Sequence, residues 1–326
     1  MPSSSLSDTV SALPTERHTK TSTPRVSLGV PVYNGERFLA TSLESLLAQT
    51  FDDLEVLISD NGSTDGTEHI ARSFVARDPR VRYERAHENR GASWNYQNVV
   101  RQTTGEYFKW ATHDDLLAPT YIERCVEALD AAPPSVVLVY PRTQIIDEEG
   151  NVVRVYEDNL DIRHTTPHAR LGHLVRHIVM ANASFGLIRR SALAQTRLLD
   201  AFPSADYIMM AELALLGEFW ELPEVLFSRR EHRSMSRFAN PTPEGVAEWF
   251  KPGSGRDRSP KEYWRVFFEH FNSIRRLPLS GAEQVRCVGA FAPVFLRRHG
   301  RRMLYELVGR RWHNKPAFWA RRSRRR

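Results

Sequence analysis

The chain of 326 residues is 41% hydrophobic and 26% charged, and it is long enough for one large globular domain with or without an appendage. No apolar run approaches ~20 residues, so we expect no membrane-spanning helix. The net charge of +6 originates in residues 286–326, which hold 13 Lys and Arg against one acid (+12), whereas the other 285 residues hold 32 bases and 38 acids (−6).

The N-terminal residues 1–24 are rich in Ser, Thr and Pro, and Asp8 interrupts their best apolar run. This composition predicts a disordered tail and no signal peptide. The two cysteines of the chain, Cys125 and Cys287, are too few for a disulfide framework. We therefore expect both to be free thiols in a reducing cytoplasm.

Strand-like and helix-like segments alternate in the first half of the chain. Apolar or β-branched runs predict strands at 25–33, 54–59, 81–86, 106–111 and 136–141. Stretches with apolar residues at helical spacing predict helices at 36–50, 65–76, 92–102 and 119–131. Because strands separated by helices are joined by crossovers, this order predicts an α/β fold with a mostly parallel, Rossmann-like sheet flanked by helices on both faces.

The alternation ends near residue 150. Residues 147–151 (DEEGN) predict a turn between two strands, and 206–219 is apolar nearly all round, which predicts a buried helix. From about residue 240 the sequence is aromatic and basic, with helices predicted near 243–250, 260–275 and 284–309. The predicted units are a tail (1–24), an α/β domain (25–238) and a helical, basic C-terminal extension (239–326).

Polar and acidic residues follow three of the predicted strands, in PVYNGE (31–36), SDNGSTDGT (59–67) and THDD (112–115). Ligands of an open parallel sheet bind at the carboxyl ends of its strands, so we expect the chemistry at this edge. Asp114 and Asp115 are adjacent like charges that repel each other unless a cation neutralises them. Mg²⁺ or Mn²⁺, which links protein carboxylates to substrate phosphates, would do so.

These motifs also have structural explanations. Asn61-Gly62 favours a turn, and Ser63 or Asp65 could cap the helix that follows. One of the two adjacent aspartates could cap the helix that begins near Pro119.

Four motifs in order, PVYN (31–34), DNGSTDGT (60–67), ENRGASWNYQN (88–98) and HDDLLAP (113–119), resemble the nucleotide-diphospho-sugar domain of family-2 glycosyltransferases, which has the GT-A fold. The resemblance covers about residues 25–235. It implies the following nucleotide-sugar-binding residues: Pro31, Tyr33 and Glu36 near the base and ribose, Asp60 and Asn61 on the base, and Asp114. Asp114 and Asp115 match the metal-binding DXD-type motif, with His113 in its variable position and Asp115 on the metal.

Asn61 departs from the family, which usually has an aspartate at this position. An asparagine both accepts and donates hydrogen bonds, which suits uracil or thymine better than guanine. We therefore favour a UDP- or dTDP-sugar as donor. The alternative is that Asn61 serves only the geometry of the turn.

Two downstream segments resemble the rest of a family-2 site. In FPSADYIMMAELALLGEF, Asp206 matches the catalytic aspartate, although Ser204 could simply cap this helix with Asp206 at its positive end. In FSRREHRSMS, His232 matches a basic residue near the diphosphate or the metal. The neighbouring arginines, which could bind phosphate or be solvated, are Arg229, Arg230 and Arg233.

The resemblance implies an inverting, metal-dependent glycosyltransferase of the hexosyltransferase type that uses Mg²⁺ or Mn²⁺. It would move a sugar from a UDP- or dTDP-sugar to a hydroxyl acceptor, in the synthesis of cell-surface polysaccharide or glycolipid. The alternative is a catalytically inactive nucleotide-sugar-binding or scaffold protein. A sugar nucleotidyltransferase would have a Gly-rich basic loop where this chain has PVYNGER, and nucleic-acid binding through the basic tail lacks a recognised module.

The segment FLRRHGRRMLYELVGRRW (295–312) predicts an amphipathic helix among arginines, with one apolar face formed by Met303, Leu304, Leu307 and Val308. Basic amphipathic helices bind anionic membrane surfaces. We therefore expect peripheral contact with the inner face of the cell membrane and a saccharide or lipid-linked acceptor. The alternative is a helix packed on the core with a solvated arginine rim.

Overall fold

The computed structural model describes residues 23–235, 239–240, 242–253 and 261–307. Nine strands form one sheet in the order β3-β2-β1-β4-β8-β6-β9-β5, and β7 pairs with β6. The strands are β1 (Val26–Val32), β2 (Leu54–Asp60), β3 (Val81–Arg85), β4 (Tyr107–Trp110), β5 (Leu116–Leu117), β6 (Val136–Ile146), β7 (Val152–Tyr156), β8 (Leu187–Arg189) and β9 (Glu218–Arg230). The predicted tail lies outside the described residues except for residues 23 and 24.

The helices of the described residues are α1 (Leu39–Leu47), α2 (Thr67–Arg77), α3 (Ala92–Arg101), α4 (Tyr121–Ala131), α5 (Pro167–His177), the 3-10 helix η1 (Asn182–Phe185), α6 (Arg190–Leu193), α7 (Ala205–Leu216), α9 (Pro243–Phe250), α10 (Glu262–Arg276) and α11 (Gly281–Leu307). Every helix and strand predicted in the first half is present within a few residues. The three predicted helices of the C-terminal extension are present too.

The sheet is mostly parallel, as predicted. β2 pairs in parallel with both β1 and β3, and β1 with β4. β8 is antiparallel to both β4 and β6, so β6 and its parallel partner β9 share the direction of the first four strands. Six strands therefore run one way, and their carboxyl ends lie along one edge.

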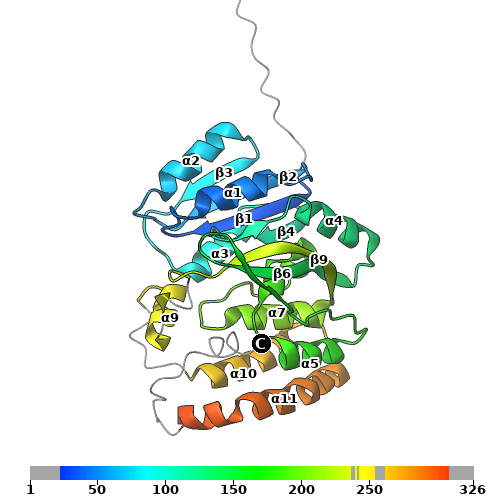
Figure 1. Cartoon of the computed structure of the whole chain (residues 1–326). Helices are drawn as coiled ribbons and strands as arrows, with labels where there is room; N and C mark the ends of the chain where they lie inside the picture. The colour runs from blue at the N-terminus through cyan, green and yellow to red at the C-terminus, as the bar shows by residue number, and fades with distance from the viewer. Residues whose placement is uncertain (1–22, 236–238, 241, 254–260, 308–326) are drawn as a thin grey trace, which may run out of the picture.

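Helices lie on both faces of the sheet (Figure 1), and an apolar core fills the space between helices and sheet on each face. α1, α2 and α4 bury their apolar stripes on one face, and α3, α5 and α7 cover the other. α7 is buried along almost its whole length, as its continuous apolar sequence predicts. Beyond α5 and α7, the helices α10 and α11 of the extension form a further layer that shares the same apolar core.

The end of β6, the turn after it and the state of the cysteines can each be compared with the sequence predictions. β6 continues to Ile146 instead of ending at Pro141, because it pairs with β9 over its full length. The predicted turn at 147–151 follows it, with the Asp147 backbone N–H donating to the Asn151 carbonyl at 3.0 Å. Cys125 and Cys287 are buried free thiols, as predicted.

The apolar face predicted for α11 is wrong in one respect. Met303 is 1% exposed and belongs to the core, whereas Leu304 and Leu307 point outward with 61% and 51% exposure. Val308 lies outside the described residues. α11 thus packs on the core through the buried residues Cys287, Phe291, Phe295, His299 and Met303. None of the helices in the described part of the chain has the length and hydropathy needed to cross a bilayer.

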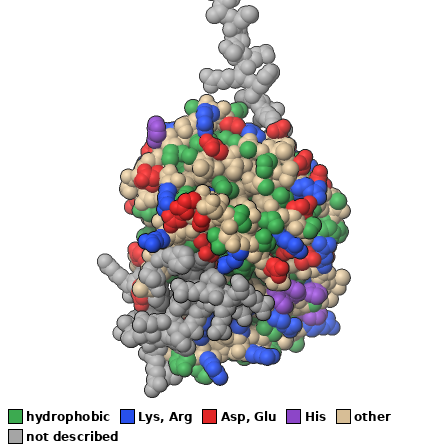
Figure 2. Space-filling view, viewed as in Figure 1, with side chains coloured by type: hydrophobic (Ala, Val, Ile, Leu, Met, Phe, Trp, Pro, Cys, Tyr) green, Lys and Arg blue, Asp and Glu red, His purple; other side chains and the backbone are tan. Residues whose placement is uncertain are grey.

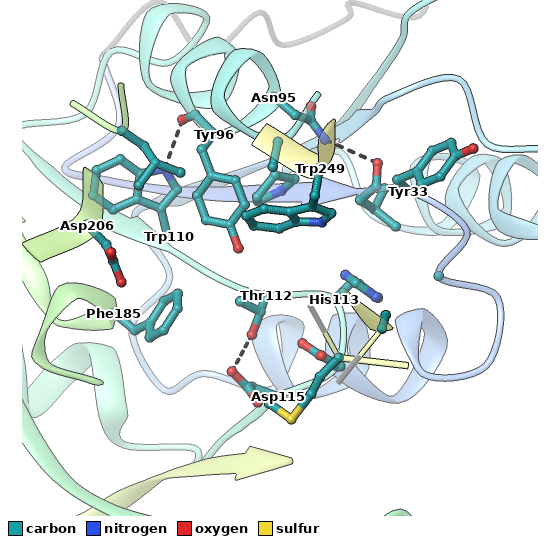
Figure 3. Close-up of a pocket in the computed structure, with 18 of the residues that line it drawn as sticks. Tyr33, Asn95, Tyr96, Trp110, Thr112, His113, Asp115, Phe185, Asp206 and Trp249 are labelled. Carbon is teal, nitrogen blue, oxygen red and sulfur yellow. Dashed lines mark hydrogen bonds between the residues drawn. The ribbon is translucent and has the colours of Figure 1, made fainter. Parts of the chain in front are cut away.

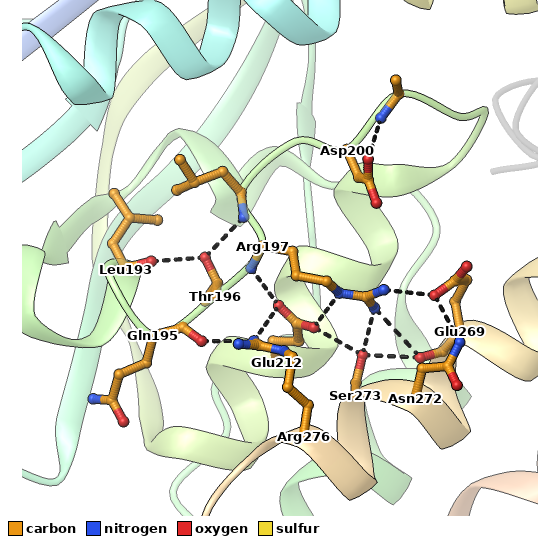
Figure 4. Close-up of polar contacts among 12 residues, drawn as sticks. Leu193, Gln195, Thr196, Arg197, Asp200, Glu212, Glu269, Asn272, Ser273 and Arg276 are labelled. Atoms are coloured by element: carbon orange, nitrogen blue, oxygen red, sulfur yellow. Dashed lines mark hydrogen bonds and ion pairs between the residues drawn. The ribbon is translucent and has the colours of Figure 1, made fainter.

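A buried ionic network joins α7 to the extension (Figure 4). Glu212 on α7 is fully buried and pairs with Arg197 at 2.8 Å and with Arg276 on α10 at 3.0 Å. The Ser273 hydroxyl on α10 donates to the same carboxylate at 3.0 Å. Because a buried carboxylate is stable only when it is fully paired, this network fixes α10 against α7.

Candidate functional site

A cavity of about 570 Å³ opens at the carboxyl edge of the sheet, where the sequence predicts the chemistry. Its wall combines the end of β1, the loop after β4, the start of α3, η1, the start of α7 and the end of β9. α9 closes one side with Trp249 (Figure 3). The cavity has room for a small-molecule ligand of substrate size.

Seven of the nine predicted site residues line this cavity: Pro31, Tyr33, Asn61, Asp114, Asp115, Asp206 and His232. Glu36 and Asp60 do not. Glu36 accepts a hydrogen bond from the Gly66 backbone at 2.8 Å. Asp60 is fully buried and accepts from the Ser63 backbone at 2.8 Å and from the Tyr83 hydroxyl at 2.7 Å. Both carboxylates therefore have partners within the protein, and contact of either with a nucleotide stays a prediction.

The two adjacent aspartates are held by the end of β9. Asp115 accepts from the Arg230 backbone N–H at 2.8 Å and from the Thr112 hydroxyl. The Asp114 carboxylate lies 2.8 Å from Nε2 of His232. The Arg230 side chain donates to the Asp114 carbonyl at 2.9 Å, which fixes the loop between the two carboxylates and β9.

Burial and mutual repulsion give these carboxyls different proton affinities. Burial raises the pKa of Asp115, and the negative charge of Asp114 raises it further. Burial acts in the same direction on Asp114, but His113 and His232 outweigh it and hold the pKa of Asp114 below its usual range. The Asp114 carboxylate is thus charged, while a nearby cation would stabilise the charged form of Asp115.

The donor set at this loop suits a hard divalent cation. Asp115 offers carboxylate oxygens, and Nδ1 of His232 is buried with no hydrogen-bond partner among the described residues. The described part of the chain contains no group of three or more His, Cys, Asp or Glu residues arranged to hold a metal. Mg²⁺ sites commonly use one or two protein carboxylates and take further ligands from substrate phosphates, so Asp115 and His232 are the residues here that would hold such an ion.

Three of the described histidines lie together away from the cavity. His164, His173 and His177 lie together near α5 (Figure 2), with the ring nitrogens of His164 and His173 3.3 Å apart. This distance fits a hydrogen bond between the two imidazole rings.

Asp206 lies at the opposite end of the cavity from Tyr33 (Figure 3). It is the second residue of α7, and burial raises its pKa to about 6, while the backbone N–H groups at the helix start and the charge of Arg229 oppose that rise. The alternative role for Ser204 is wrong, because its side chain makes no capping hydrogen bond. Asp206 is therefore ionised at neutral pH in a largely apolar pocket.

Three other charged side chains have partners within the protein. Glu212 is part of the network with Arg197, away from the cavity. Arg230 lines the cavity, but its guanidinium donates to the carbonyls of Asp147 and Glu148 at 3.0 and 2.9 Å. Arg229 also lines the cavity, and its guanidinium donates to the Asn182 side chain.

Asn61 is engaged by the loop before α3. Its amide nitrogen donates to Asn89 at 2.9 Å and to the Gly91 carbonyl at 3.2 Å, and its oxygen accepts from the Arg90 backbone at 2.9 Å. These contacts support the structural explanation of this residue. Its contact with a base stays a prediction.

The sequence patterns missed part of the cavity wall. Asn95 and Tyr96 lie inside the quoted ENRGASWNYQN motif, so its helical spacing could have indicated that they face the site. Trp249 and Phe250 come from α9, more than 130 residues beyond the last strand-end motif. No local signal marks them, because tertiary packing alone brings α9 to the site.

Comparisons with known proteins agree with this geometry. Residues 27–196 match the profile of glycosyl transferase family 2. The chain is 31% identical over 210 residues to chondroitin synthase from Escherichia coli, a match that covers 64% of this chain and 29% of that protein. It spans only 21% to 40% of the length of the first curated relatives that it matches.

Solved structures share the fold at low sequence identity. The S. aureus TarS fragment 1-349 in complex with UDP-GlcNAc superposes with a TM-score of 0.60 at 17% identity, covering 85% of this chain and 73% of that one. The mannosyltransferase PcManGT from Pyrobaculum calidifontis, in complex with GDP-Man and Mn²⁺, has a TM-score of 0.50 at 17% identity, covering 87% and 81%.

Proposed function

Because this chain belongs to glycosyl transferase family 2 and has the GT-A fold, we propose that it transfers a sugar from a nucleotide-diphosphate donor to a hydroxyl acceptor with inversion. The observation that carries this proposal is that a single cavity contains the Asp114–Asp115 pair and a half-buried aspartate, Asp206. Two separated carboxylate centres suit such a transfer, because one end must hold the diphosphate and the other must accept a proton.

Asp206 is the general base in this proposal. Its carboxylate is ionised above pH 6 and is held at the positive end of α7. It takes the proton of the acceptor hydroxyl as that oxygen attacks the anomeric carbon from the face opposite the diphosphate. The C–O bond to the diphosphate breaks as the new one forms, which inverts the configuration.

Asp114, Tyr33 and Pro31 contact the donor at the other end of the cavity. Asp115 and His232 would hold Mg²⁺ or Mn²⁺, which supplies positive charge to the leaving diphosphate. Arg229 adds a fixed cation between the two ends, since its charge lowers the pKa of both Asp115 and Asp206. The presence of Mn²⁺ in the PcManGT complex supports use of a divalent metal.

The donor is a UDP- or dTDP-sugar in this proposal, which the UDP-GlcNAc complex of TarS supports. A hexosyl group transferred to a growing saccharide or lipid-linked acceptor, in polysaccharide or glycolipid synthesis, is supported by the similarity to chondroitin synthase. The protein acts in the cytoplasm, at the inner face of the cell membrane.

Peripheral membrane contact is supported by the outer face of α11. Leu296, Leu304 and Leu307 are exposed there, beside the exposed side chains of Arg297 and Arg301. Apolar side chains between arginines can insert between anionic headgroups while the guanidinium groups bind them. The buried face of α11 stays packed on α5 and α10 in this arrangement.

Replacing Asp206 with Asn should lower kcat by ~10²–10⁴-fold, because the amide cannot accept the acceptor proton. Thermal stability and donor binding should be near those of the wild type. The kcat of the wild type should fall as the pH drops below about 6, where Asp206 becomes protonated. Asp200→Asn, close in sequence but outside the cavity, is the matched control. Turnover by Asp206→Asn at the wild-type rate would sink the assignment.

UDP or dTDP with Mn²⁺ should raise the melting temperature of the wild type more than either nucleotide alone. Asp115→Asn keeps an oxygen for the Arg230 N–H but weakens the metal site, so the metal-dependent part of the shift should disappear. Differential scanning fluorimetry measures this, with Asp161→Asn as an exposed control. Equal metal-dependent shifts in the wild type and Asp115→Asn would rule out Asp115 as a ligand.

Co-sedimentation with vesicles containing anionic phosphatidylserine tests the membrane contact. The double variant Leu304→Glu/Leu307→Glu should bind several-fold less, because it adds negative charge and removes apolar contacts while leaving Met303 in the core. A second double variant, Val152→Glu/Val155→Glu, changes exposed apolar residues on β7 and serves as the matched control. Unchanged binding by the α11 variant, or equal loss in both, excludes this face.

A further inference from the structure

Ser204, the residue before α7, has an unusual backbone conformation. Its φ is +67°, in the left-handed region, which residues other than glycine and asparagine rarely adopt without compensating contacts. It is 8% exposed, and its hydroxyl does not cap the helix. The hydroxyl donates instead to Oε1 of Glu262 at 2.8 Å.

Glu262 is the first residue of α10 in the C-terminal extension. It lies beyond residue 196, where the family match ends. The same helix holds α7 a second time through Ser273 and Arg276, which bind Glu212 (Figure 4). α10 therefore makes two contacts with this region. One is with Ser204, the residue before α7, and the other is with Glu212 near the C-terminal end of α7.

We propose that Glu262 is a positioning residue for sugar transfer, which keeps Ser204 in its left-handed conformation and so fixes the direction of the Asp206 carboxylate. This inference rests on the proposed function, in which Asp206 is the base. The turn at Ser204 decides where the first residues of α7 begin. Asp206 follows two residues later, and a shift of its carboxylate would separate it from the acceptor hydroxyl.

The two carboxyl groups also interact through their charges. Burial raises the pKa of Glu262 and the charge of Asp206 raises it further, against the hydrogen bond from Ser204 and the charge of Arg302. Other ionisable groups near Glu262 are Arg298, His299 and Glu306 on α11 and Tyr263 and His270 on α10. Those near Asp206 are Arg229 on β9, Tyr96 on α3 and Tyr207 on α7.

Two variants distinguish a positioning role of Glu262 from a purely structural one. Ser204→Ala removes the hydroxyl and leaves a strained alanine, so the start of α7 can relax. Glu262→Gln keeps an oxygen for the Ser204 hydroxyl but removes a carboxyl group close to Asp206. Ser204→Ala tests the geometry at the start of α7, and Glu262→Gln tests the effect of the Glu262 carboxyl group on Asp206.

Steady-state kinetics of the full-length protein over pH 5 to 8 provide the test. Ser204→Ala should lower kcat by ~10-fold or more with little change in KM for the donor, because misplacement of the base affects the transfer step and not donor binding. Glu262→Gln should keep much of kcat and move the acid limb of its pH profile to lower pH, since Asp206 then ionises more easily. Asn272→Ala, which removes an exposed hydrogen bond to Glu269 on the same helix, should match the wild type.

The outcomes are distinguishable from failure of the proposed function. If Asp206→Asn is inactive while Ser204→Ala and Glu262→Gln keep the wild-type kcat and pH profile, the positioning role is overturned and the proposed base stands. If Glu262→Gln loses activity only in proportion to a lower melting temperature, with an unmoved acid limb, its role is structural and the inference fails. If Asp206→Asn retains turnover, the base assignment itself fails.

Discussion

The attachment of Asp114 and Asp115 to the end of β9 is the interaction on which the rest of the site depends. Two neighbouring carboxylates at the end of a buried strand repel each other, and burial makes each harder to ionise. The backbone and side chain of Arg230 bind this loop from β9, and His232 binds Asp114. Together with the pairing of β5 with β9, these contacts hold the loop after β4 beside a strand more than 100 residues later in the chain.

The same attachment explains why the C-terminal half of the chain reaches the site. β9 follows α7 directly, so fixing its end beside Asp115 also places the buried helix that carries Asp206. α9 then closes the cavity. Gly91, with a φ of +85°, lies against α9 so closely that a Cβ there would collide with the Phe250 carbonyl. The extension is therefore part of the cavity wall. The boundary predicted near residue 238 marks only a change in sequence composition.

Local patterns predicted the fold well, because strand and helix periodicity depends on neighbours along the chain. They also predicted that Asp114 and Asp115 lie at the carboxyl edge of the sheet, where the ends of parallel strands meet. The resemblance to family-2 glycosyltransferases added Asp206, which lines the same cavity. Local patterns gave less information where long-range partners decide the position of a side chain. Asp60 is held by Tyr83, which lies on the next strand, β3, and Met303 is turned inward by the packing of α11.

Ser204 is another residue whose partner could not be predicted from the neighbouring sequence. Its position before an apolar helix favours a capping role, and only α10, which comes later in the chain, gives its hydroxyl another partner.

The central claim is that this cavity binds a nucleotide diphosphate through a metal held by Asp115. Crystals grown with UDP and Mn²⁺ test it most directly, since the anomalous scattering of manganese locates the ion. We predict one anomalous peak within roughly 2–2.5 Å of both the Asp115 carboxylate and the diphosphate oxygens, with the base toward Tyr33. A nucleotide bound outside the cavity, or bound within it while manganese lies away from Asp115, would contradict the claim.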